Sequence, residues 1–118
     1  NTDVIIDDPY INLPLKGQKI AVGYFKLSNL LNNTIVLSDV FCSDMEVSLH
    51  TSLSNEDGIM TMQPLQKIEI ESGSSVTFEP GSNHLMIAGL DTLMNTDKLE
   101  CTLVVDETWN LPITFELK

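Results

Sequence analysis

Residues 21–42 read AVGYFKLSNLLNNTIVLSDVFC, and this stretch decides the fold class. Ala21 to Asn29 and Thr34 to Cys42 are rich in β-branched and aromatic residues, which favour strands over helices. Between them, Leu30 to Asn33 has the composition of a turn. The stretch therefore predicts two strands joined by a tight connection.

Further strand-like segments follow at short intervals along the chain. They are residues 47–50, 59–64, 68–70, 76–79, 83–90, 98–106 and 111–117. Turn pairs such as Asp57-Gly58 and Pro80-Gly81 separate them, and residues 90–94 are expected to add no more than a single helical turn. Strands at this spacing predict an all-β fold, an antiparallel β-sandwich or barrel. With 118 residues, of which 42 % are hydrophobic, the chain is expected to form one domain over residues 1–118.

The charge of the chain excludes some classes of partner. Seventeen acidic residues face six lysines and no arginine, which gives a formal net charge of −11. This charge repels phosphate backbones and anionic lipid surfaces, so we expect no nucleic-acid partner. No apolar run approaches the roughly 20 residues that span a bilayer, so no membrane insertion is expected. The first residues lack a basic segment and a leader core, as in a mature form or a chain that never had a signal peptide.

Two cysteines, Cys42 and Cys101, stand in apolar, strand-like surroundings. Their separation fits no metal-ligand motif, and neutral or acidic neighbours argue against a reactive thiolate. Two interpretations stay open: buried free thiols, or a disulfide between neighbouring strands of the core.

The two histidines of the chain, His50 and His84, each lie close to methionines. Met60 and Met62 follow the expected hairpin after His50, and Met86 comes two positions after His84. Side chains two apart on a strand point to the same face, so His84 and Met86 project together, as do Met60 and Met62. The hairpin is expected to fold His50 back beside the two methionines. Four donors are then predicted to converge at one edge of the sandwich.

The donor types point to a particular ion. Thioether sulfur is soft and uncharged and selects Cu(I) over zinc, magnesium or calcium, while imidazole suits copper in either oxidation state. Taken singly, a methionine on a strand is usually core packing. Two short clusters that combine both histidines with three of the five methionines instead favour a Cu(I) site.

The spacing of these residues is specific. Eleven residues separate His50 from Met62, and 21 more separate Met62 from the tripeptide His84-Leu85-Met86. With this pattern, and with the surrounding segments 47–50, 57–64 and 84–90, the chain resembles the periplasmic copper chaperone family called PCuAC. The resemblance extends over residues 21–117.

The resemblance implies a cupredoxin-like Greek-key β-sandwich with His50, Met62, His84 and Met86 as ligands of one Cu(I) ion. Met60 lies outside the family pattern and is interpreted as a nearby auxiliary sulfur or as simple packing, of which packing is favoured. Many members have a methionine close after the first histidine, where this chain has Thr51 and Ser52, and many carry a Met/His-rich tail that this chain lacks. A second copper site is therefore not expected.

The family also implies a function. It carries Cu(I) in the periplasm to a copper-accepting protein, notably the CuA site of cytochrome c oxidase subunit II, and often works alongside Sco-type proteins. For this chain we expect a periplasmic metallochaperone that is a monomer and not an enzyme. A blue-copper protein is disfavoured because neither cysteine is followed by the His and Met ligands of such a site. The remaining alternative is a β-sandwich protein-interaction module with no metal role.

Overall fold

The computed structural model of the chain describes residues 3–13, 20–42, 45–54, 56–89 and 97–118. These residues form ten strands, and the all-β prediction is confirmed. The strands are β1 (Val4–Asn12), β2 (Ile20–Asn29), β3 (Ile35–Phe41), β4 (Glu46–Ser54), β5 (Met60–Leu65), β6 (Ile68–Ile70), β7 (Ser75–Phe78), β8 (His84–Ala88), β9 (Lys98–Val105) and β10 (Trp109–Leu117). No helix long and apolar enough to cross a bilayer occurs in the described part of the chain. The helical turn predicted for residues 90–94 lies outside the described residues.

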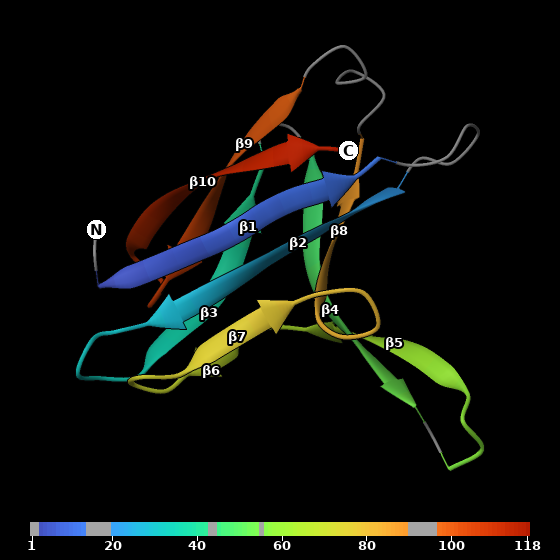
Figure 1. Cartoon of the computed structure of the whole chain (residues 1–118), viewed down its shortest axis with the longest axis horizontal. Helices are drawn as coiled ribbons and strands as arrows, with labels where there is room; N and C mark the ends of the chain where they lie inside the picture. The colour runs from blue at the N-terminus through green and yellow to red at the C-terminus, as the bar shows by residue number, and fades with distance from the viewer. Residues whose placement is uncertain (1–2, 14–19, 43–44, 55, 90–96) are drawn as a thin grey trace.

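The strands form one hydrogen-bonded path in the order β5-β4-β8-β2-β1-β10-β9-β3-β6. Strand β7 also pairs with β2, beyond the part of β2 that pairs with β8. The path curves so that β3 comes back close to β4, and the core lies inside this curve. All pairs are antiparallel except β1 with β10, which run side by side in the same direction (Figure 1).

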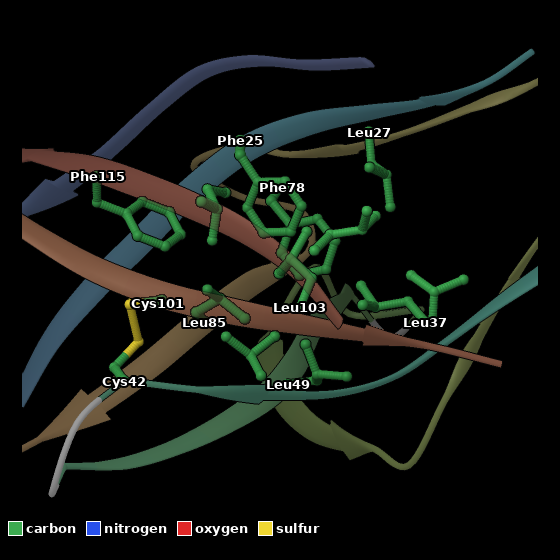
Figure 2. Close-up of a cluster of buried hydrophobic side chains, with 14 of the residues drawn as sticks. Phe25, Leu27, Leu37, Cys42, Leu49, Phe78, Leu85, Cys101, Leu103 and Phe115 are labelled. Carbon is green, nitrogen blue, oxygen red and sulfur yellow. A yellow bond between two sulfur atoms is a disulfide. The ribbon is translucent and has the colours of Figure 1, made fainter. Parts of the chain in front are cut away.

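The core forms because apolar residues alternate along most strands. On β10 the residues Leu111, Ile113 and Phe115 are buried while their neighbours are not, as the sequence predicts. At the centre, the ring of Phe25 stacks on Phe78 with centroids 4.5 Å apart and meets Phe115 edge-on at 6.0 Å (Figure 2). Phe25 of β2 thereby packs against residues of both β7 and β10.

A disulfide joins Cys42 to Cys101 at one side of this core (Figure 2). Phe41, at the end of β3, pairs with Thr102 of β9, so Cys42, the residue that follows β3, lies beside Cys101. The two Cα atoms are 4.3 Å apart. Of the two interpretations left open by the sequence, the structure therefore has the core disulfide.

The turn predicted after β2 is held by a buried amide. The side chain of Asn29 donates hydrogen bonds to the carbonyl oxygens of Asn33 and Ile70, each at 2.9 Å. Its own oxygen accepts one from the backbone N–H of Leu31 at 3.0 Å. Asn29 is thus buried without leaving its polar groups unpaired.

Candidate metal centre

Strands β4 and β8 form the base of the centre, and alternation gives their pair two different faces. Leu49 of β4 and Leu85 and Ile87 of β8 point into the core, where Leu49 and Leu85 lie close to each other (Figure 2). The residues between them, which include His50, His84 and Met86, point the other way. We call this side the outer face. The strand pattern therefore excludes both histidines from the apolar core and directs them to one surface.

The two histidines lie directly opposite each other on this face. The register of the antiparallel pair places His50 across from His84. Their rings are nearly parallel, at an interplanar angle of 16°, and the ring centroids are 5.9 Å apart. The sequence prediction that His50 and His84 come together is met, because β4 pairs with β8 on one side and with β5 on the other.

His84 has one ring nitrogen fixed and the other free. Its Nδ1 lies 3.0 Å from the carbonyl oxygen of Ser82, which can only accept a hydrogen bond, so Nδ1 carries the proton. Nε2 is then left with a lone pair. The side chain is only 6 % exposed, and Nε2 is buried with no hydrogen-bond partner among the described residues. A buried polar atom without a partner is costly, and a metal ion would satisfy it.

His50 is more accessible than its partner. It is half-buried, and its Nδ1 lies 3.4 Å from the hydroxyl oxygen of Ser48, a neighbour on the same outer face. This contact is longer than that between His84 and Ser82. The ring of His84 is therefore fixed by its contact with the backbone, whereas the ring of His50 is held less firmly and is more accessible.

Two methionines flank the histidine pair. Met86 lies across from Ser48, and Met62 lies across from Ser52, so both point to the outer face but from opposite sides of His50. Such diagonal neighbours are about 7 to 8 Å apart, within reach of long side chains. The structure therefore places all four predicted ligands on one face of three neighbouring strands. Met86 is half-buried, whereas Met62 is 58 % exposed.

The difference in exposure follows from the position of β5. Strands β4 and β5 form a hairpin that extends away from the other strands (Figure 1), and residues 60–64 of β5 are all exposed. β5 is also the edge strand of the path. We call residues 52–54 and 56–62 the arm. Met60 lies on it and is 55 % exposed, so the expectation that Met60 is a packing residue is not met.

The donor set suits a soft ion. In the part of the chain that the structure describes, no three His, Cys, Asp or Glu side chains gather in a way that could hold a metal. The other candidate ligands on the outer face, beside the histidine pair, are the thioether sulfurs of Met62 and Met86. Two neutral imidazoles and two neutral thioethers match the ligand preference of Cu(I) and not that of the hard cations, which take oxygen.

Sequence reasoning found the four side chains but missed the groups that support them. The carbonyl of Ser82 belongs to the backbone just before β8, and every residue has such a carbonyl. The hydroxyl of Ser48 carries a weak signal, because it lies two positions before His50 and hence on the same face.

Solved structures with the same fold define the class of the protein. The chain is similar to a copper-bound PCuAC domain from PmoF2, with a TM-score of 0.78 and 23 % identity, over 98 % of this chain and 92 % of that one. It is similar to the PCuAC domain of PmoF1 in its apo form, with a TM-score of 0.78 and 19 % identity, over 98 % of this chain and 93 % of that one. The fold is thus that of a PCuAC domain, and the predicted cupredoxin-like sandwich is confirmed.

A family model makes the assignment more specific. The model of the LpqE-like lipoproteins matches residues 4–117, and the chain belongs to this LpqE-like family. The resemblance to PCuAC proteins inferred from the sequence is confirmed by this match together with the solved structures. A comparison with curated proteins finds no match.

Proposed function

We propose that the protein binds one Cu(I) ion through His50, Met62, His84 and Met86 and passes it to an acceptor protein. One observation carries the proposal: Nε2 of His84 is buried without a partner on the face where His50 lies opposite. The similar domain of PmoF2, whose structure is described as copper-bound, supports the same choice of metal.

The oxidation state follows from the donors. Thioethers favour Cu(I), and a set of four neutral ligands leaves the single positive charge of Cu(I) uncompensated. A second positive charge would find no thiolate to balance it, since both cysteines are joined in the disulfide. Electron transfer of the blue-copper type is disfavoured for the same reason, because that site needs a cysteine ligand.

The gradient of exposure supports delivery of copper rather than catalysis. His84 is buried, His50 and Met86 are half-buried, and Met62 is mostly exposed. An incoming ligand from an acceptor would meet Met62 first, and copper would then leave by stepwise exchange of ligands. This mechanism needs no nucleophile and no general base, so we propose that the protein is not an enzyme.

The proposed location is outside the cytoplasm, and more specifically the periplasm. The family is one of lipoproteins, and a core disulfide persists in oxidising compartments. Thioether ligands suit such a compartment, because they do not form disulfides. The acceptor that we propose is the CuA site of cytochrome c oxidase subunit II, with a Sco-type protein as an additional partner.

An anaerobic titration with Cu(I) in the presence of a chromogenic Cu(I) chelator tests the copper site. We expect a stoichiometry of one for the native protein and loss of this binding in His84→Ala and Met86→Leu. Met45→Leu is the matched control, because Met45 packs against the core and is not on the outer face of the histidine pair.

Absence of chelator-competitive binding in the native protein would contradict the proposal and favour the interaction module without a metal role. X-ray absorption on the loaded protein gives an independent count of the ligands. We expect two nitrogen and two sulfur neighbours around copper.

A further inference from the structure

We propose that Met60 is a further Cu(I) ligand, which lies outside the four-ligand centre and receives the ion as it leaves. The inference rests on the proposed function, since it concerns the same ion. It adds a residue that lies outside the four-residue pattern of the family. The observations that carry this inference are the register of the arm and the exposure of the Met60 side chain.

The register places Met60 in line with the centre. Met62 lies across from Ser52 and Met60 across from Ser54, while His50 lies two positions before Ser52 on the same strand. Since side chains two apart share a face, His50, Met62 and Met60 all point to the outer face. They succeed one another along the arm, away from β8.

The exposure of Met60 is not explained by packing. Its side chain is 55 % exposed and is absent from the apolar residues that pack on the core, whereas Met45 is among them. Met62, two residues away, is exposed to nearly the same extent, at 58 %.

The spacing of the two methionines allows them to share an ion. Residues two apart on a strand are about 6.6 to 6.8 Å apart along it. Methionine has three rotatable side-chain bonds, so two sulfurs at this spacing can turn toward one ion between them. Exposed Glu56, at the turn of the arm, adds a negative charge on the side toward which the ion would move.

The transfer step is an exchange of ligands. A bond from Met60 sulfur to copper forms while the bonds to His84 Nε2, to Met86 sulfur and to the His50 ring nitrogen break, and Met62 holds the ion throughout. Each leaving ligand keeps its lone pair, so no electron or proton moves and copper stays Cu(I). The ion ends on two thioethers of the exposed arm, where an acceptor with soft ligands can take it.

Exchange of copper between two copies of the protein measures this step. Unlabelled Cu(I)-loaded protein is mixed anaerobically with apo protein labelled with 15N, and the loading of the labelled copy is followed by NMR. Donor and acceptor have equal affinities, so the rate reports the transfer alone. We expect Met60→Leu to slow the exchange about tenfold, which corresponds to roughly 1.4 kcal/mol of barrier. Its equilibrium affinity for Cu(I) should stay that of the native protein.

Two further variants test whether the position of the sulfur on the arm matters. Ser54 lies directly across from Met60 on the same face, so Met60→Leu combined with Ser54→Met is expected to restore fast exchange. Thr61 lies across from Leu53, on the opposite face. Met60→Leu combined with Thr61→Met is therefore expected to remain slow, which separates a positioned sulfur from a merely nearby one.

The outcomes distinguish this inference from the proposed function. Exchange at the native rate in Met60→Leu, with one copper still bound, overturns the role of Met60 and leaves the four-ligand centre intact. Weakening of the equilibrium affinity by Met60→Leu as strong as that by Met62→Leu also overturns it, because Met60 would then be a resident ligand. Failure of the native protein to bind Cu(I) removes both proposals.

Discussion

The carbonyl oxygen of Ser82 lies 3.0 Å from Nδ1 of His84, and this contact decides which ring nitrogen is available to a metal. The proton stays on Nδ1, and the lone pair of Nε2 is presented on the outer face before any ion arrives. A ring held in this way loses little orientational freedom on binding, which favours affinity.

The tautomer of His84 can be observed in the apo protein. At neutral pH we expect 15N chemical shifts typical of a ring protonated on Nδ1, and a large shift of Nε2 on addition of Cu(I). His50 is the internal control, because its contact with Ser48 is longer, at 3.4 Å, and should hold its tautomer less firmly. Protonation of Nε2 in apo His84 would contradict the proposed centre.

Copper affinity should depend on pH through the imidazoles. A histidine must be unprotonated to bind a metal, whereas a thioether carries no proton to displace, so the affinity for Cu(I) is expected to fall with increasing acidity. The fall should be less steep in His50→Ala, which has lost one of the two competing protonation sites. In Met62→Leu the affinity should be lower by about tenfold or more at each pH, or roughly 1.4 kcal/mol, with an unchanged slope. Chelator competition at several pH values measures the affinity of the native protein and of the two variants. An affinity of the native protein that is independent of pH would exclude histidine ligation.

The disulfide should contribute strongly to stability. It closes a loop with a sequence separation of 59, and the chain-entropy model gives about 4 kcal/mol for a loop of this length. We expect replacement of both Cys42 and Cys101 by alanine to lower the free energy of unfolding by about this amount in urea titrations. The folded variant should still bind one Cu(I), because neither cysteine lies in the centre. An unchanged free energy of unfolding would argue that the disulfide adds little to the packed core.

The buried phenol of Tyr24 leads us to expect that the folded protein loses stability at alkaline pH. Burial raises the pKa of Tyr24 above its ordinary value of 10.0, and the neighbouring Tyr10 raises this pKa further. The folded state thus favours the neutral phenol. This contribution is complete below pH 10.0 and is lost as pH rises through the raised pKa of the folded state.

Unfolding of the native protein and of Tyr24→Phe by urea, each at several alkaline pH values, tests this prediction. The native protein should lose stability above pH 10.0 more steeply than Tyr24→Phe. Equal pH dependence of the two proteins would contradict it.

Much of the fold is predictable where strand alternation and turn residues agree. Strand β10 shows this, since its buried residues alternate as the sequence indicates. Gly58 and Gly81 both have positive φ values in the turns where the sequence places them, because glycine adopts this conformation at little cost. The candidate ligands were found because a spacing of two residues on a strand fixes a common face.

Other features have no local signal. β1 was not predicted, because Asp7-Asp8-Pro9 interrupts it with residues that disfavour strands. The structure accommodates them in an irregularity between Asp7 and Tyr10, where Asp8 has a φ of 50° and the ladder with β2 shifts. Likewise, the pairing of the cysteines and the projection of the arm depend on tertiary contacts that no short window of sequence contains.

The parallel pairing of β1 with β10 has a consequence for how the molecule reaches its native state. Tyr10 pairs with Glu116, so β1 can complete this pairing only after β10 has been synthesised. Contacts between such distant positions are entropically expensive and slow to form. We expect the nascent chain to remain incompletely folded until β10 has emerged from the ribosome, because only then can β1 gain this partner.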